Sequence, residues 1–360
     1  MSRIPVPWCM TVCPEFITET ALITIRAWYR EEAAQLRARE TTRRVLRDEF
    51  AVDPLGDSLV IDAPSYISTQ VLGGGELLQP EDDMPMFREP PLKTARDVYS
   101  LGLPPSYVDH PAMAPYIGMY RRLLNRFGQD RKVHLSSGIQ GPVTTAVLLR
   151  GQSFFIDLIE RPADAHFLLD FVTGADIRFM QELRELQGEP LYGGDVSISD
   201  DFAGLMSPDH FGEFVVPCYQ RFFEVLNAGR RFLHSELLRS GHLGWLSEMH
   251  LNCLNLGENQ YLKPSDVIKN TRVPFDWHVK TSTLAQGTPA MVREEYIAAL
   301  EDGAVAMVAE LAARRIPKEN IQAFVEVARA FGPSVEPAGY YVASLRAQEM
   351  RQLTRHRPHS

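Results

Sequence analysis

The chain has little cysteine, no long apolar run and no excess of positive charge. Its four cysteines, Cys9, Cys13, Cys218 and Cys253, are too few and too scattered for a disulfide framework, which predicts a reducing, cytoplasmic location. The start of the chain lacks the basic and apolar regions of a signal peptide. No apolar run approaches the roughly 20 residues that a membrane helix needs, so a membrane is not expected as a partner.

The charge balance and the missing motifs exclude several classes of ligand. A formal net charge of −9 over 360 residues argues against nucleic acid, which would need a basic face. No GxGxxG follows the first predicted strand, the glycines at 73–75 do not form that motif, and no Walker lysine is present. The sequence therefore predicts a globular protein that acts on a small molecule.

Predicted strands and helices alternate over the last two thirds of the chain. Strands are predicted at 58–63, 132–135, 190–195, 230–234, 251–256, 273–279 and 304–309. Helices are predicted at 114–127, 142–150, 153–159, 162–186, 208–227, 238–249, 289–302 and 318–330. This alternation indicates parallel strands with right-handed crossovers, either in a (β/α)8 barrel or in an open doubly wound sheet. The missing dinucleotide fingerprint favours the α/β barrel, with an eighth strand hidden in the loop-rich region 64–115.

Three regions are predicted along the chain. Residues 1–50 would form an N-terminal extension, irregular up to residue 19 and helical from about residue 20. The barrel would occupy residues 51–340. Residues 341–360 are polar and basic and would form a frayed tail.

Imidazole and carboxyl side chains follow four consecutive strands at their C-terminal ends, where a β/α barrel carries its chemistry. His234 and Glu236 lie two residues apart and so share one face of a strand. Glu258, His278 and Glu310 follow the next three strands. Neutral imidazole and carboxylate suit zinc, iron or manganese, so we predict a divalent metal held by His234, Glu236, Glu258 and Glu310.

A metal-free acid–base site is the alternative use of such residues. A carboxyl group with a raised pKa would protonate a carbanion or activate water. Asp200 and Asp201 lie on a loop before a helix start at Ser207-Pro208, and with His278 they are the candidate catalytic residues. The candidate substrate contacts are Ser136, Gln140 and Asp195, each near the end of a predicted strand.

Five segments, taken in order, resemble the uroporphyrinogen decarboxylase superfamily. They are GPVTTAVLLRG from Gly141, FIDLIERP from Phe155, DDFAGLMSP from Asp200, QGTPAMV from Gln286 and IPKENIQAF from Ile316. The resemblance runs from about residue 50 to residue 335 and implies a β/α barrel whose cleft lies at the strand ends.

The superfamily's decarboxylases and methyltransferases differ in their characteristic residues. Its decarboxylases begin with an arginine-rich segment that holds the porphyrinogen carboxylates, whereas this chain has PWCMTVCPEFITET. Its methyltransferases move a methyl group between a corrinoid carrier and a thiol, with zinc held by His-x-Cys and a later Cys. Related cobalamin-independent methionine synthases add a glutamate ligand. Here His234-Ser-Glu236 keeps the histidine and replaces the thiolate by a carboxylate, and Glu258 and Glu310 follow in the regions of the later ligands.

The resemblance therefore implies a metal-dependent enzyme most like a zinc-type methyltransferase, with an altered His/Glu site. It would transfer a C1 group to or from a small polar substrate, with zinc favoured over iron or manganese. A corrinoid protein is the partner that it implies, and a homodimer is a further expectation. The alternatives are a metal-free decarboxylase or lyase that acts on a small carboxylate, and a non-catalytic barrel.

Overall fold

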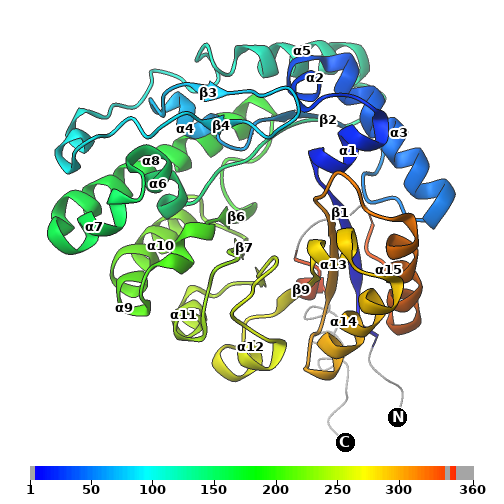
Figure 1. Ribbon diagram of the computed structural model, residues 1–360. Helices are drawn as coiled ribbons and strands as arrows, with labels where there is room; N and C mark the ends of the chain where they lie inside the picture. The colour runs from blue at the N-terminus through cyan, green and yellow to red at the C-terminus, as the bar shows by residue number, and fades with distance from the viewer. Residues whose placement is uncertain (1–4, 337–340, 346–360) are drawn as a thin grey trace, which may run out of the picture. The chain divides into compact units, whose positions relative to one another are not determined.

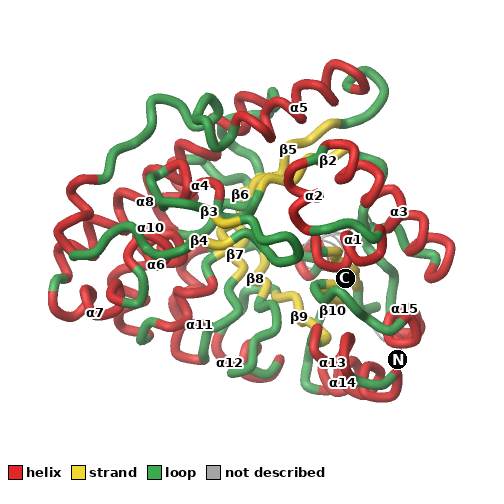
Figure 2. The backbone as a smooth tube through the Cα atoms, turned by 45° about the horizontal axis from the view of Figure 1, so that its top comes forward, coloured by secondary structure: helices red, strands yellow, loops and turns green. Residues whose placement is uncertain are grey.

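A computed structural model describes residues 5–336 and 341–345 of the chain. The chain divides into two compact units, one formed by residues 1–23, 37–56 and 232–360 and the other by residues 24–36 and 57–231. Both units contain parallel strands with helices between them, which makes the fold mixed α/β (Figures 1 and 2). Within the described part of the chain, no helix has the length and apolar character needed to cross a membrane.

The first unit contains a parallel sheet in the strand order β1-β10-β9-β8-β7. Its strands are β1 (Trp8–Val12), the last three residues of β7 (Arg230–His234), β8 (Cys253–Asn255), β9 (Phe275–Val279) and β10 (Met307–Leu311). Its helices are α1 (Pro14–Ala21), α11 (Ser240–Leu246), α12 (Pro264–Asn270), α13 (Thr281–Gln286), α14 (Pro289–Glu301) and α15 (Lys318–Phe331), with most of α3 (Glu32–Phe50). Because the strands are parallel, their C-terminal ends meet along one edge of the sheet.

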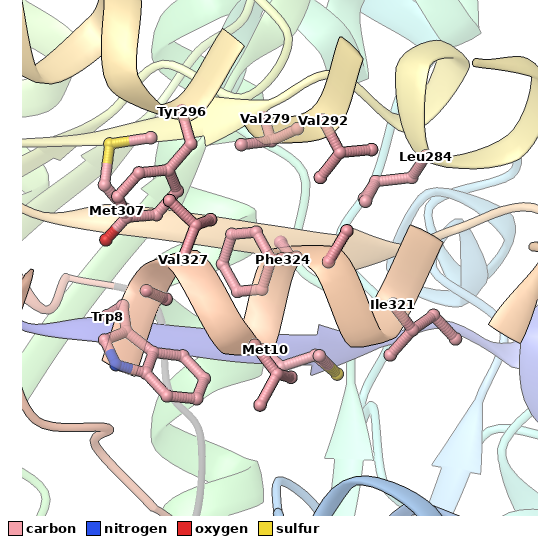
Figure 3. Close-up of a cluster of buried hydrophobic side chains, with 14 of the residues drawn as sticks. Trp8, Met10, Val279, Leu284, Val292, Tyr296, Met307, Ile321, Phe324 and Val327 are labelled. Atoms are coloured by element: carbon pink, nitrogen blue, oxygen red, sulfur yellow. The ribbon is translucent and has the colours of Figure 1, made fainter. Parts of the chain in front are cut away.

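A core of apolar side chains fixes helices α14 and α15 against this sheet. Phe324 of α15 is fully buried, and its ring meets the rings of Trp8 from β1 and Tyr296 from α14, each at a centroid distance of 5.7 Å (Figure 3). Burying one such phenylalanine is worth about 1.5–3 kcal/mol. Strand β1 is therefore held in place by packing as well as by its ladder with β10.

The second unit contains the parallel pair β2 (Leu59–Ala63) and β5 (Val133–Ser137), the strand β6 (Asp195–Ser199) and a short antiparallel pair, β3 (Leu77–Leu78) and β4 (Met86–Phe87). Its longer helices are α5 (Ala114–Phe127), α6 (Pro142–Arg150), α7 (Ser153–Glu160), α8 (Pro162–Leu186) and α10 (Val216–Val225). Shorter helices are α2 (Ile25–Arg30), α4 (Ile67–Val71) and α9 (Pro208–His210). A single bridge joins Gln140, ahead of α6, to Ser199 at the end of β6.

Proline marks the starts of several helices in both units. Pro142, Pro162 and Pro289 each occupy a first-turn position, where the missing N–H costs no hydrogen bond. The Ser207 side chain accepts a hydrogen bond from His210 N and caps α9, as its position before Pro208 predicts. The predicted helix 208–227 is interrupted by a π-helical segment at Phe211–Val215. Pro217 follows at the start of α10 and has no N–H for a helical bond to an earlier carbonyl.

Four sequence predictions about the fold were wrong. The irregular start contains β1 and α1, so residues 8–12 belong to the sheet and not to an extension. The eighth strand predicted in the loop-rich region 64–115 is not found, because the strands there are only the two-residue β3 and β4. The predicted strand 190–195 is β6 at Asp195–Ser199, so Asp195 begins this strand and does not end it.

The fourth difference concerns the predicted tail. Val342 and Ala343 are buried in the first unit, and the Tyr341 ring stacks on Phe232 at a centroid distance of 4.4 Å. The remaining tail residues, 346–360, lie outside the described residues.

Candidate functional site

Two imidazole–carboxylate pairs lie at the C-terminal ends of strands in the first unit. His234 ends β7, and its Nε2 lies 3.8 Å from Oε1 of Glu236. His278 of β9 and Glu310 of β10 form the second pair, with Nδ1 of the histidine 3.9 Å from Oε2 of the glutamate. The strand-end pattern in the sequence predicted these four residue types, and the structure brings them together as pairs.

His278 is neutral at neutral pH. Its side chain is fully buried, and burial lowers the pKa of its imidazole to about 4, assisted by the nearby charge of His234 and opposed by Glu310. A ring with this pKa accepts or donates hydrogen bonds near pH 7 without bringing a positive charge into the site. The structure therefore favours a hydrogen-bonding role for His278 over the proton-donor role that its position suggested.

Asn255 connects His234 to the next strand. It ends β8 directly opposite His234 in the ladder and is fully buried. Its side-chain Oδ1 lies 3.0 Å from His234 Nδ1 and accepts a hydrogen bond of 2.9 Å from the backbone N–H of Gly257. These contacts hold the imidazole ring of His234 in one orientation.

Gly257 leaves the space in which Glu236 lies. A Cβ atom at position 257 would lie 2.7 Å from Cδ of Glu236 and closer still to its Oε1. The backbone of Gly257 also has a φ of +51°, in the left-handed region that costs other residues about 1–2 kcal/mol. Glycine at this position therefore allows both the turn and the approach of Glu236 to His234.

Replacing Gly257 by alanine is expected to destabilise the protein by more than the backbone strain alone. Gly188 is a matched control, because its φ is +67° and no described residue other than its two chain neighbours lies within 4 Å of the position of its Cβ. Chemical denaturation should show a larger loss for Gly257→Ala than for Gly188→Ala. Adding Glu236→Ala to the first variant should remove the excess, since it clears the overlap. Equal losses for the two single variants would contradict this packing.

Glu258 and Cys13 are both linked to Glu310 of the second pair, Glu258 through Thr281 and Cys13 directly. The carboxylate of Glu258 accepts a hydrogen bond from the backbone N–H of Thr281, the first residue of α13. The hydroxyl of Thr281 in turn donates to the backbone carbonyl of Glu310 over 3.2 Å. Cys13 follows β1, and its Sγ lies 3.4 Å from Oε1 of Glu310. The side chain of Glu258 thus contributes to the start of α13.

The predicted metal ligands do not fit a resident metal ion as their side chains stand. The donor types are those that zinc, iron or manganese use, but a protein site needs at least three of them around one point. Within residues 5–336 and 341–345, no three His, Cys, Asp or Glu side chains are grouped so that they could hold a metal ion. His234 and Glu236 form one pair and His278 and Glu310 another, while Glu258 is engaged with Thr281.

In the second unit, Asp200 is buried and surrounded by donors. Its Oδ1 accepts hydrogen bonds from the backbone N–H and the hydroxyl of Thr144, and its Oδ2 accepts from the N–H of Val143 and the hydroxyl of Tyr219. Burial raises the pKa of this carboxyl group to about 6 despite the four hydrogen bonds, which lower it. A Cβ at Gly141 would lie 2.7 Å from Oδ2, so glycine is required where the chain passes this carboxylate. Asp200 therefore holds the start of α6.

The other predicted residues of the second unit have different surroundings. Asp201 opens the 3-10 turn after Asp200 and lies close enough to Tyr66 to help burial raise the pKa of that phenol. Ser136 lies on β5, and Gln140 bridges to β6. Asp195 lies at the amino end of β6, where its carboxylate pairs with Arg230, so it is at the opposite end of the strand from its predicted place.

Sequence reasoning missed Asn255 and Gly257. Both fall within or just after a predicted strand, and neither residue type alone indicates chemistry. The signal available was the spacing Asn-x-Gly at a strand end, where an asparagine side chain can accept from the backbone two residues on.

Comparison with known proteins gives a family for this chain. The profile of the family described as Uroporphyrinogen decarboxylase (URO-D) matches residues 62–331. A methyltransferase from Methanosarcina mazei is similar in structure, with a TM-score of 0.68 and 19% identity over 91% of this chain and 94% of that one. A B12-independent methionine synthase from Shewanella sp. W3-18-1 aligns with a TM-score of 0.47 and 12% identity, over 98% and 100% of the two chains.

No curated protein matches the chain. The likeness to the methyltransferase is one of fold, because the identity is low. The family match spans most of the sequence, including the segments at Gly141, Asp200 and Gln286 on which the resemblance was based. The chain belongs to the uroporphyrinogen decarboxylase (URO-D) family.

Proposed function

We propose that the chain is an acid–base enzyme that acts on a small polar carboxylate at the C-terminal ends of β7 to β10. The proposed reaction class is carbon–carbon bond cleavage with loss of carbon dioxide. The observation that carries this proposal is the His234–Glu236 pair, next to a second imidazole that burial keeps neutral. The closed (β/α)8 barrel and the cytoplasmic location predicted from the sequence are kept as parts of the proposal.

The two members of the pair have complementary roles. The distance of 3.8 Å between His234 Nε2 and Glu236 Oε1 is longer than a direct hydrogen bond, but it keeps the two side chains close enough to act on the same substrate atom. When the carboxyl carbon leaves as carbon dioxide, the bonding electron pair stays on the substrate carbon. The His234–Glu236 pair then delivers a proton to that carbon and recovers it from water.

The remaining side chains would orient the substrate. His278 would donate or accept a hydrogen bond as a neutral ring beside Glu310. Ser136, Gln140 and Asp201 stay predictions from the sequence and are not assigned to this set of side chains. Asp200 is left out of this role because four donors from the protein itself already bind its carboxylate.

The test is enzyme-dependent release of carbon dioxide. A panel of small 3-oxo, malonyl and aromatic acids would be incubated with the full chain, and the gas followed by membrane-inlet mass spectrometry. For the active substrate, Glu236→Gln and His234→Gln should each lower kcat by about 10²–10⁴-fold, the usual size of a lost general acid–base group. Glu248→Gln, an exposed glutamate of the same unit, is the matched control and should leave the rate unchanged. Equal rates in all four proteins, or no release from any acid, would overturn the proposal.

A second candidate function is metal-dependent C1 transfer, favoured by the donor chemistry of the same strand ends. Imidazoles and carboxylates follow β7 to β10, and the Cys13 thiol lies 3.4 Å from Glu310. Zinc, or iron or manganese, would be the metal, and a corrinoid protein and a second copy of the chain would be the partners. Metal analysis of protein purified without added metal separates the two candidates. About one equivalent of a single transition metal supports C1 transfer, and less than about a tenth supports the acid–base enzyme.

A further inference from the structure

The side chain of Asn255 is anchored through only one of its two polar atoms. Its Oδ1 contacts two partners, His234 Nδ1 and the Gly257 N–H, whereas its Nδ2 is buried and has no hydrogen-bond partner among the residues that the structure describes. A buried N–H group that lacks an acceptor costs about 1–3 kcal/mol. Exchanging the amide oxygen and nitrogen would not remove this cost, because the Gly257 N–H would then face another donor.

The anchored oxygen determines the protonation pattern of His234. Because the Gly257 N–H can only be met by an acceptor, the oxygen of the amide lies on that side. The same oxygen lies 3.0 Å from His234 Nδ1, so this ring nitrogen carries the proton. In the neutral ring, Nε2 is then the unprotonated nitrogen, and it is the atom that faces Glu236.

We propose that Asn255 is a positioning residue of the site. Its Oδ1 fixes the Nδ1–H tautomer of His234, so that the unprotonated Nε2 faces Glu236. This role follows from the contacts of the amide oxygen and does not rest on the proposed reaction.

Two substitutions at this position test the role. Asn255→Asp keeps an acceptor for His234 Nδ1 and for Gly257 but replaces the NH₂ group by an oxygen. Asn255→Ala removes both. The tautomer can be measured without substrate, from the ¹⁵N shifts of the His234 ring in histidine-labelled full-length protein at alkaline pH, with the signal assigned by its loss in His234→Gln.

The wild-type protein should show one protonated and one unprotonated nitrogen in His234, widely separated in shift. Asn255→Asp should keep this separation, and Asn255→Ala should reduce it. An unchanged pattern in Asn255→Ala, or an Nε2–H pattern in the wild type, would overturn the positioning role.

Discussion

Replacing Asp276 by alanine is expected to lower the free energy of unfolding by about 3 kcal/mol or more. Asp276 lies on β9 within the first unit and is fully buried. Its Oδ2 accepts hydrogen bonds from the backbone N–H groups of Tyr341 and Val342, and its Oδ1 accepts one of 2.8 Å from Ala343. Alanine would leave three backbone donors without their acceptor and a cavity beneath them, and each buried unpaired donor costs about 1–3 kcal/mol.

Chemical denaturation of three variants checks this expectation. Asp276→Asn keeps one acceptor oxygen and places an NH₂ group against the remaining donors, so its loss should be intermediate. Asp266→Ala is the control, because that carboxylate caps α12 at the surface and should cost about 1 kcal/mol. A loss for Asp276→Ala no larger than that of the control would show that the segment 341–345 does not depend on Asp276.

The same carboxyl group makes stability depend on pH. Burial raises the pKa of Asp276 to about 6 from its usual 3.8, although its hydrogen bonds lower it. Between these values the native protein holds more protons than the unfolded chain, so stability falls as pH rises from about 4 to about 6. Asp276→Asn should lack this part of the fall. The comparison is best made as the difference between wild type and variant, because His278, whose pKa is lowered, contributes in the opposite direction over the same range.

Sequence reasoning located the elements whose signals are local. The bounds of α5, α6 and α8 were predicted as the structure has them, because proline and glycine mark their starts and apolar residues recur with helical spacing. Strand β1 was missed because its five residues follow two prolines. Its place in the sheet is set by pairing with β10, some three hundred residues further along the chain. Strand pairing of this kind leaves no periodic signal near either strand.

In the candidate site, too, some features could be predicted from the local sequence and others could not. The spacing of two residues between His234 and Glu236 predicted that they share one side of a strand. The strand ends at His234 and Glu236 follows in a turn, with its carboxylate 3.8 Å from the imidazole. Which partner each carboxylate takes could not be predicted, because it depends on register and on space. Glu236 lies against His234 only because position 257 has no Cβ, and Glu258 is engaged with the start of α13. The sequence likewise gave no sign that Asp200, one of two adjacent acids on a predicted loop, is fully buried.

That buried acid, Asp200, gives the second large expected effect. Asp200→Ala should lower the free energy of unfolding by about 4 kcal/mol or more, because four donors from Val143, Thr144 and Tyr219 lose their acceptor. Asp200→Asn should also be costly, since the four donors are shared between two oxygens and asparagine offers one. Asp209→Ala, an exposed acid in the first turn of α9, is the control and should cost about 1 kcal/mol or less.

Hydrogen exchange distinguishes a clamp on α6 from a catalytic acid. If Asp200 holds the start of that helix, the amide protons of Val143 and Thr144 should exchange faster in Asp200→Asn than in the wild type, while those of α5 remain as they are. Asp201→Asn should leave these exchange rates unchanged, because Asp201 does not take part in the bonds to Val143 and Thr144. Wild-type exchange at α6 in an Asp200→Asn protein that has lost activity would assign Asp200 to the chemistry instead, as its place in the sequence first suggested.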